Sequence, residues 1–236
     1  MAKDIANYNS QILGKFIVDF KKACPNDKVL IIAHSLGARV TLSTIQWIYD
    51  NYIGGLDTNN TSKMIASIHL LDAAVNNEQI SKDLNDCKSF TPSLQCSEDT
   101  IEKVVGHFYN LYDTKDKMLT DEIGLSCPFF TCPSPYHTSE HHDALGSYGN
   151  ESVTYAPSNY REYDVTSKII ADADADKDKD QGLYCDIYLY YHCAIKDIGD
   201  NHIGYMGFRV NNNPQIPVYN SGAIGSVVTD WRNEPN

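Results

Sequence analysis

The feature that most constrains the fold is a short apolar run followed at once by a turn of small residues. Residues 29–32, Val-Leu-Ile-Ile, have the length and composition of a buried strand, and Ala-His-Ser-Leu-Gly at 33–37 leads into a helix-like segment. This strand–turn–helix order is typical of parallel α/β sheets, and small residues at 33 and 37 allow a tight turn that presents the serine as a nucleophile. The sequence therefore predicts an α/β fold with Ser35 as a candidate nucleophile. A buried serine in an ordinary turn is the alternative.

A nucleophilic serine needs a base to take its proton and an acid to orient that base, in the chain order serine, acid, base. Residues 107–112 are predicted to form a strand, and the polar loop after it contains Asp113 and Asp116. Parallel sheets place reactive groups at the carboxyl ends of their strands. We expect Asp116 to be the acid, with Asp113, and Asp72 after the apolar strand at 65–71, as alternatives.

The base is expected in the loop after the last strand. Residues 183–191, Leu-Tyr-Cys-Asp-Ile-Tyr-Leu-Tyr-Tyr, are predicted to form that strand, and the following loop leads to His202. His192 adjoins the tyrosine-rich run, which favours a structural role. His202 is therefore the predicted base, and the backbone N–H of Leu36, directly after the nucleophile, is the predicted oxyanion donor.

Three segments carry these candidates: Ala-His-Ser-Leu-Gly-Ala-Arg at 33–39, Asn-Leu-Tyr-Asp-Thr-Lys-Asp-Lys-Met-Leu at 110–119 and His-Ile-Gly-Tyr at 202–205. With them, the chain resembles the α/β-hydrolase fold over about residues 5–210, and it is most similar to a poorly characterised group of serine hydrolases from archaea and bacteria. Residues 144–146 and 164–166 also fit that pattern. The resemblance implies a mostly parallel sheet and the triad Ser35, Asp116 and His202, and it says little about the substrate. From the candidate residues we expect hydrolysis of a small carboxylic ester or related acyl compound, without a required cofactor.

The resemblance also implies several strands before the elbow strand, and this chain has none there. One amphipathic helix precedes residue 29, with apolar residues at helical spacing: Ile5, Tyr8, Ile12, Phe16, Ile17 and Phe20. We therefore expect the N-terminal half of the sheet, and the loop that donates the second oxyanion N–H, to be missing. The chain would then be a fragment, a half whose sheet another chain completes, or a degenerate half-fold. Self-association through the exposed edge of the elbow strand is expected.

Length and composition predict a single domain over residues 1–236, 42% of them apolar. Its core is expected at about 1–119 and 183–236. The stretch at about 120–182 is rich in Pro, Gly, Tyr and Asp and is expected to form a cap or insertion over the active site. No apolar run approaches the ~18–20 residues of a membrane span, so none is expected.

A formal charge of −12 argues against binding to nucleic acids or anionic lipid surfaces, because both require clustered Lys and Arg. The seven cysteines favour an extracellular or cell-surface protein with disulfides, and a cytoplasmic protein with buried thiols is the alternative. Cys87 with Cys96, and Cys127 with Cys132, bracket short loops that could be closed by local disulfides, whereas Cys24 is expected to be free. Met1 is not followed by the pattern of a secretory signal.

Two segments could bind cations. Alternating aspartates concentrate hard oxygen ligands, with Asp172, Asp174 and Asp176 as the candidate calcium ligands, although no register matches an EF-hand. A solvated acidic loop is the alternative. The second cluster is His137, His141, His142 and Asp143. Histidines at i and i+4 on a helix could share a zinc ion, but nearby Pro and Gly favour a loop.

A second class of function is compatible with the same sequence. A non-catalytic cell-surface or binding protein could retain the hydrolase scaffold, and the missing half of the sheet favours it. The ordered serine, acid and base favour an enzyme instead.

Overall fold

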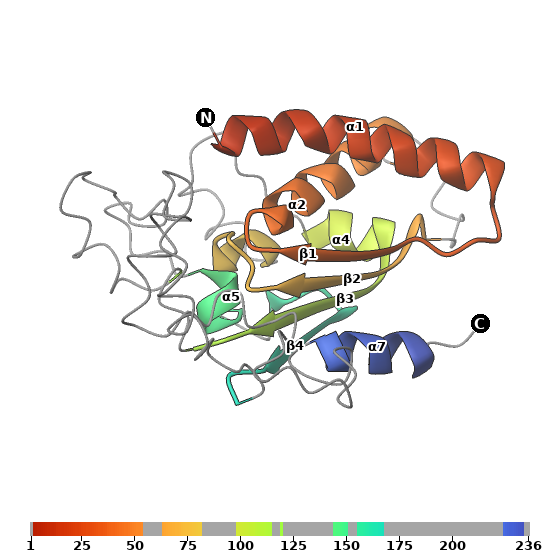
Figure 1. Ribbon diagram of the computed structural model, residues 1–236. Helices are drawn as coiled ribbons and strands as arrows, with labels where there is room; N and C mark the ends of the chain where they lie inside the picture. The colour runs from red at the N-terminus through yellow and green to blue at the C-terminus, as the bar shows by residue number, and fades with distance from the viewer. Residues whose placement is uncertain are drawn as a thin grey trace, which may run out of the picture.

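A parallel four-stranded sheet forms the centre of the protein. The computed structural model describes residues 2–53, 63–81, 98–114, 119, 144–150, 155–167 and 224–233. The strands lie in the order β1-β2-β3-β4, and every neighbouring pair is parallel (Figure 1). Their bounds are β1 Leu30–His34, β2 Ile65–Leu71, β3 Val105–Tyr112 and β4 Tyr160–Asp164. This arrangement confirms the predicted α/β class and the parallel sheet.

Three of these strands match the sequence prediction, and the fourth does not. The strands predicted at 29–33, 65–71 and 107–112 correspond to β1, β2 and β3. β4 lies within the stretch at 120–182, for which a cap or insertion is predicted. The strand predicted at 183–191 lies outside the described residues. β4 has little apolar pattern because it borders the described sheet on one side only and leaves Arg161, Tyr163 and Asp164 exposed.

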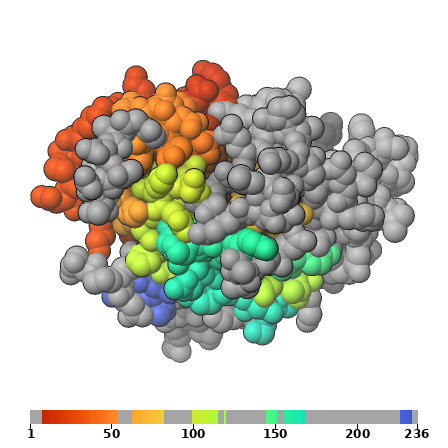
Figure 2. All heavy atoms as spheres, turned by 180° about the vertical axis from the view of Figure 1, so that it is seen from behind, coloured from red at the N-terminus to blue at the C-terminus, as the bar shows by residue number. Residues whose placement is uncertain are grey.

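One face of the sheet packs against α2 Gly37–Ile48 and α4 Glu98–Val104, and α1 Ala2–Ala23 packs on α2. Ile68 and Leu70 of β2 and Phe108 of β3 meet buried aliphatic side chains of these helices in one apolar cluster. Side chains alternate along a strand, so these positions share a face. α4 also anchors the segment before β4, because Ser158 N donates to Glu102 Oε1 at 2.6 Å; the two segments lie side by side in Figure 2.

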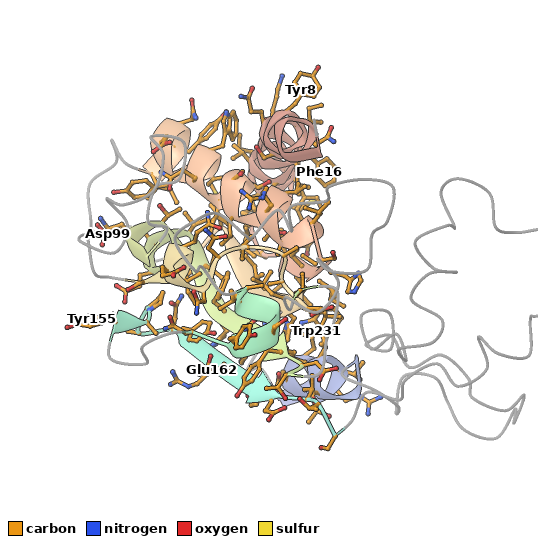
Figure 3. The ribbon with its side chains drawn as sticks, turned by 90° about the vertical axis from the view of Figure 1, so that its left-hand side faces the viewer. Tyr8, Phe16, Asp99, Tyr155, Glu162 and Trp231 are labelled. Carbon is orange, nitrogen blue, oxygen red and sulfur yellow. The ribbon has the colours of Figure 1, made fainter. Side chains whose placement is uncertain are left out.

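The opposite face of the sheet is covered by α7 Ile224–Asn233. Val227 packs with Leu71 and Leu111 in a second apolar cluster, and Trp231 lies between α7 and the sheet (Figure 3). The indole Nε1 of Trp231 donates to Ser67 Oγ at 3.1 Å. The sheet is therefore sandwiched between helices on both faces, as parallel sheets require.

Shorter elements complete the description. A π-helical turn continues α2 over Tyr49–Ile53, and a 3-10 turn at Asn77–Ile80 follows β2. The short helix α5, Leu145–Tyr148, lies against the C-terminal ends of the strands. Among the described residues, no helix has both the length and the apolar character needed to cross a membrane.

The helix predicted before the elbow strand is confirmed as α1, and the predicted apolar stripe is buried only in part: Ile17 is buried, whereas three other members are exposed. Tyr8, Ile12 and Phe16 are 69%, 57% and 65% exposed, and Tyr8 and Phe16 are on the outer side of α1 in Figure 3. The side packed on α2 carries Gly14, where a Cβ would overlap the ring of Trp47. A glycine allows this close helix contact, so the tightest packing is found where the sequence has no large apolar residue. The packed side is completed by buried Ser10, Ile17 and Val18.

Candidate active site

The turn between β1 and α2 holds Ser35 in an uncommon backbone conformation. Ser35 has a φ of 53°, in the left-handed region, and Asp72 is the other non-glycine residue with positive φ in the described part of the chain. A left-handed conformation costs about 1–2 kcal/mol for a residue with a Cβ. Such strain persists only where the surroundings enforce it, and it is concentrated at functional sites.

Three backbone hydrogen bonds enforce the conformation of Ser35. Its N–H donates to Leu71 O at 3.0 Å, which extends the β1–β2 ladder by one residue. Its carbonyl accepts from Ala38 N at 3.0 Å and from Ala74 N at 3.1 Å. The turn is therefore tied both to the first turn of α2 and to the chain after β2.

The small residues on either side of Ser35 face each other, as the sequence predicts. A Cβ built on Gly37 would lie 3.7 Å from the Cβ of Ala33, which is ordinary van der Waals contact. Ala33 is buried. Larger side chains at both positions would compete for this space, so the close return of the backbone depends on their small size.

Leu36, the predicted oxyanion donor, is the residue that precedes α2. Its φ and ψ of −60° and −19° are already helical. The first N–H groups of a helix have no acceptor within the helix, and they form the positive end of its dipole. Partial positive charge at the start of α2, directly after Ser35, suits stabilisation of an anion that develops there.

Two of the three acid candidates lie at the same edge of the sheet as Ser35. β1 pairs with β2 up to His34 and Leu71, so Ser35 and Asp72 are each the first residue beyond their strands. Asp113 follows β3 directly. Both carboxyl-bearing residues are fully buried. Asp116, the preferred acid, and His202, the preferred base, lie outside the described residues.

The segment 144–146 joins the chain after β2 to the chain after β3. Gly146 N donates to Ala73 O at 3.0 Å, and Gly146 O accepts from Asp113 N at 2.8 Å. A Cβ at Gly146 would overlap the backbone atoms Asp72 C and Ala73 N, so only glycine fits at this position. Leu145 N donates to Val75 O at 2.8 Å. This segment therefore fills the space beside the two buried aspartates.

A buried polar side chain on β3, which no sequence pattern pointed to, is hydrogen-bonded to segment 144–146. Asn110 of β3 is buried and donates through Nδ2 to Leu145 O at 2.9 Å. On β4, Glu162 Oε2 accepts from Tyr160 Oη and from Asn150 N, each at 2.9 Å. Burial, together with the nearby Glu162 carboxylate, holds the pKa of the Tyr160 hydroxyl well above its usual range, so Tyr160 acts as a hydrogen-bond donor.

A second polar group, also absent from the sequence analysis, lies under α7. His69 of β2 is fully buried, and its Nε2 lies 3.2 Å from Asp230 Oδ2. Its ring stacks on Tyr109 at 4.4 Å between centroids and meets the edge of Trp231 at 5.8 Å. Burial lowers the pKa of His69, and this effect outweighs the opposing influence of Asp230. The sequence gives a signal for a special position here, because His69 is the one titratable residue in the mostly apolar strand β2.

The predicted cation sites and most cysteines lie outside the described residues. These are Asp172, Asp174 and Asp176, the histidine group at 137–142, and every cysteine except Cys24. Within the described ranges, the structure brings together no group of three or more His, Cys, Asp or Glu side chains that could hold a metal ion. In the part of the chain that the structure describes, Cys24 forms no disulfide. Calcium binding and disulfide formation stay predictions.

Comparisons of the chain with models of known protein families, with curated proteins and with solved structures found no match. Inferences about the site therefore rest on the conformation, burial and hydrogen bonds of its own residues.

Proposed function

We propose that this protein is a serine hydrolase of the α/β-hydrolase fold that cleaves a carboxylic ester or a related acyl compound. The observation that carries the proposal is the left-handed conformation of Ser35 at the end of a parallel strand, directly before a helix. A nucleophile elbow needs this geometry because it lifts the serine side chain clear of the sheet edge. An ordinary βα turn does not need a strained serine.

In the proposed reaction, Ser35 Oγ attacks the acyl carbon while His202 takes its proton. Asp116 holds the imidazole in the productive orientation. The N–H of Leu36, at the positive end of α2, stabilises the oxyanion of the tetrahedral intermediate. His202 then returns the proton to the leaving alcohol, and a water activated by the same imidazole hydrolyses the acyl-enzyme.

Labelling with a fluorophosphonate probe tests the nucleophile. The probe should react covalently with the wild-type protein at Ser35, and the reaction should disappear in Ser35→Ala and fall strongly in His202→Ala. Ser43→Ala is the matched control, because Ser43 lies on α2, about two turns beyond the elbow, and its replacement should not change labelling. Labelling that survives in Ser35→Ala would remove the nucleophile assignment.

A non-catalytic binding protein is the second candidate, and the position of the elbow strand favours it. β1 is the first strand of the described sheet, so the described part of the chain holds no strand beyond it whose loop could supply a second oxyanion donor. Loss of one such donor costs about 10²–10³ in kcat. A folded wild-type protein that resists the probe would support this second function.

A further inference from the structure

The carboxyl ends of β1, β2 and β3 are connected by a continuous series of hydrogen bonds. From Ser35 O the series passes to Ala74 N at 3.1 Å. It continues from Ala73 O to Gly146 N at 3.0 Å. From Gly146 O it reaches Asp113 N at 2.8 Å. Segment 144–146 is therefore the physical spacer between the elbow and the loop that begins at Asp113.

Segment 144–146 is not a continuation of either β2 or β3, so its position depends on hydrogen bonds to both. Its N–H groups bond to Ala73 and Val75, both after β2. On the β3 side, the side chain of Asn110 supplies the donor to Leu145 O, at 2.9 Å within the buried interior. The same carbonyl also accepts from Gly149 N at 3.1 Å, within the α5 turn, so Asn110 is its link to β3. An aliphatic residue at position 110 would remove that link and one of the two hydrogen bonds to a buried carbonyl, which is costly in a low-dielectric interior.

We propose that Asn110 is a positioning residue, which fixes segment 144–146 and thereby sets the loop after β3 relative to Ser35. The proposal rests on the proposed function, because the acid candidates Asp113 and Asp116 belong to this loop. Asn110 touches neither the substrate nor the reacting atoms. It acts through Leu145 and Gly146, and Gly146 is confined to glycine by its contact with the chain after β2.

The charge and shape of Asn110 suit this role better than those of an acid or an aliphatic residue would. An amide donates to the Leu145 carbonyl without carrying a charge into the buried interior. Asn110→Asp would place a carboxylate oxygen against that carbonyl, which is repulsive. Asn110→Ala removes the donor and leaves space. Both variants should therefore release the spacer.

The structure provides a matched control at the other end of the same strand. Asn159 also donates through Nδ2 to a backbone carbonyl, that of Val105 at 2.8 Å, at the point where β3 begins. Asn159 directly precedes β4, and Asn159→Ala removes a side-chain amide that is bonded to the start of β3 but leaves the carboxyl edge of the sheet untouched. A loss of stability should appear in both alanine variants, whereas an effect on the position of the loop should appear in Asn110→Ala alone.

The experiment measures steady-state hydrolysis of a p-nitrophenyl ester against pH, and amide hydrogen exchange in the same variants. Asn110→Ala should lower kcat by about 10²-fold with little change in KM, because a small misplacement of a catalytic group has an effect of that size. The acidic limb of kcat/KM should move to lower pH, since a misaligned carboxylate no longer favours protonation of the base. Asn159→Ala should leave both kcat and the limb unchanged.

Hydrogen exchange keeps this inference separate from the proposed function. The amides of Asp113 and Gly146 should exchange faster in Asn110→Ala than in wild type, whether or not the protein is an enzyme. If wild type fails to react with the fluorophosphonate while this exchange effect is present, the proposed function falls and the positioning of the loop stands. Unchanged exchange at both amides, or equal kinetic losses in Asn110→Ala and Asn159→Ala, would overturn the positioning role.

Discussion

Ser35 and Asp72 occupy equivalent positions on neighbouring strands, and both have left-handed backbones, with φ of 53° and 54°. Each is the first residue beyond its strand, and the backbone around one is bonded to the backbone around the other. Each left-handed conformation costs free energy that the rest of the fold must offset, so two of them at neighbouring strand ends indicate that this edge of the sheet serves a function.

The first prediction concerns the strain at Ser35. Ser35→Gly should raise the free energy of unfolding by about 0.5–1 kcal/mol, because glycine adopts positive φ without the steric cost that other residues incur. The same variant should lose fluorophosphonate labelling. Ser43→Gly, within α2, should instead destabilise by about 0.5–1 kcal/mol. Urea denaturation measures both changes, and equal destabilisation by the two variants would contradict a strained elbow.

The second prediction separates the acid candidates. Asp116→Asn should cause the largest loss in kcat, of about 10⁴-fold, because the orienting carboxylate fixes the tautomer of the base. Asp72→Asn and Asp113→Asn alter buried residues and should mainly reduce thermal stability. Ester hydrolysis and melting temperature are measured on all three. If Asp72→Asn or Asp113→Asn lowered kcat more than Asp116→Asn does, with an unchanged melting temperature, that residue would be the orienting acid instead.

The third prediction concerns the spacer glycine. Gly146→Ala should destabilise the protein by about 1–3 kcal/mol, because the new Cβ would overlap backbone atoms that cannot move independently. Gly37→Ala is the control, since its Cβ would make only ordinary contact with Ala33. Chemical denaturation measures both. If Gly146→Ala proves as stable as wild type, the chain after β2 is less tightly packed than its geometry indicates.

The fourth prediction concerns pH. Burial lowers the pKa of His69 in the folded protein, whereas an unfolded histidine titrates near pH 6.5. Above about pH 6.5 both states hold a neutral imidazole, and the full stability is present. As the pH falls below that value, the unfolded state takes up a proton more readily, so the free energy of unfolding decreases until the lowered pKa is reached.

His69→Phe should therefore weaken the dependence of stability on pH between about 7.5 and 5.5, because phenylalanine keeps the ring but does not titrate. His107→Gln is the comparison: His107 is exposed on the neighbouring strand and is the smallest of the influences on the pKa of His69, so its replacement should change the pH dependence less than His69→Phe. Urea denaturation followed by tryptophan fluorescence is suitable, because Trp231 contacts His69. A pH dependence unchanged in His69→Phe would place its origin in other groups.

The fifth prediction concerns association. Tyr8, Ile12 and Phe16 form an exposed apolar stripe on α1, which lies on the β1 side of the sheet (Figure 1). Exposed apolar stripes and strand edges both favour association, so the chain should self-associate at micromolar concentrations. Light scattering should show less association for Ile12→Glu than for Gln11→Glu, which adds the same charge at an exposed position beside the stripe. A wild-type monomer at all concentrations would contradict this expectation.

The sequence by itself determined the elements that local patterns specify. The apolar run at 29–32 predicted β1, the small residues around Ser35 predicted the turn, and helical spacing predicted α1. Each of these signals lies within about one or two turns of chain, where backbone sterics and side-chain periodicity act directly. The sequence also placed Asp72 and Asp113 at strand ends, next to the expected nucleophile.

The tertiary structure decided what depends on partners distant in the chain. Asn110 bonds to Leu145, and His69 meets Asp230 across 161 positions, so local sequence does not indicate the partner of either side chain. β4 forms because β3 offers it a free edge, although its own residues are mostly polar. The buried side of α1 was decided in the same way. Helical periodicity identified the larger apolar stripe, but α2 packs where Gly14 permits the closest approach, and close approach between helices depends on both surfaces at once.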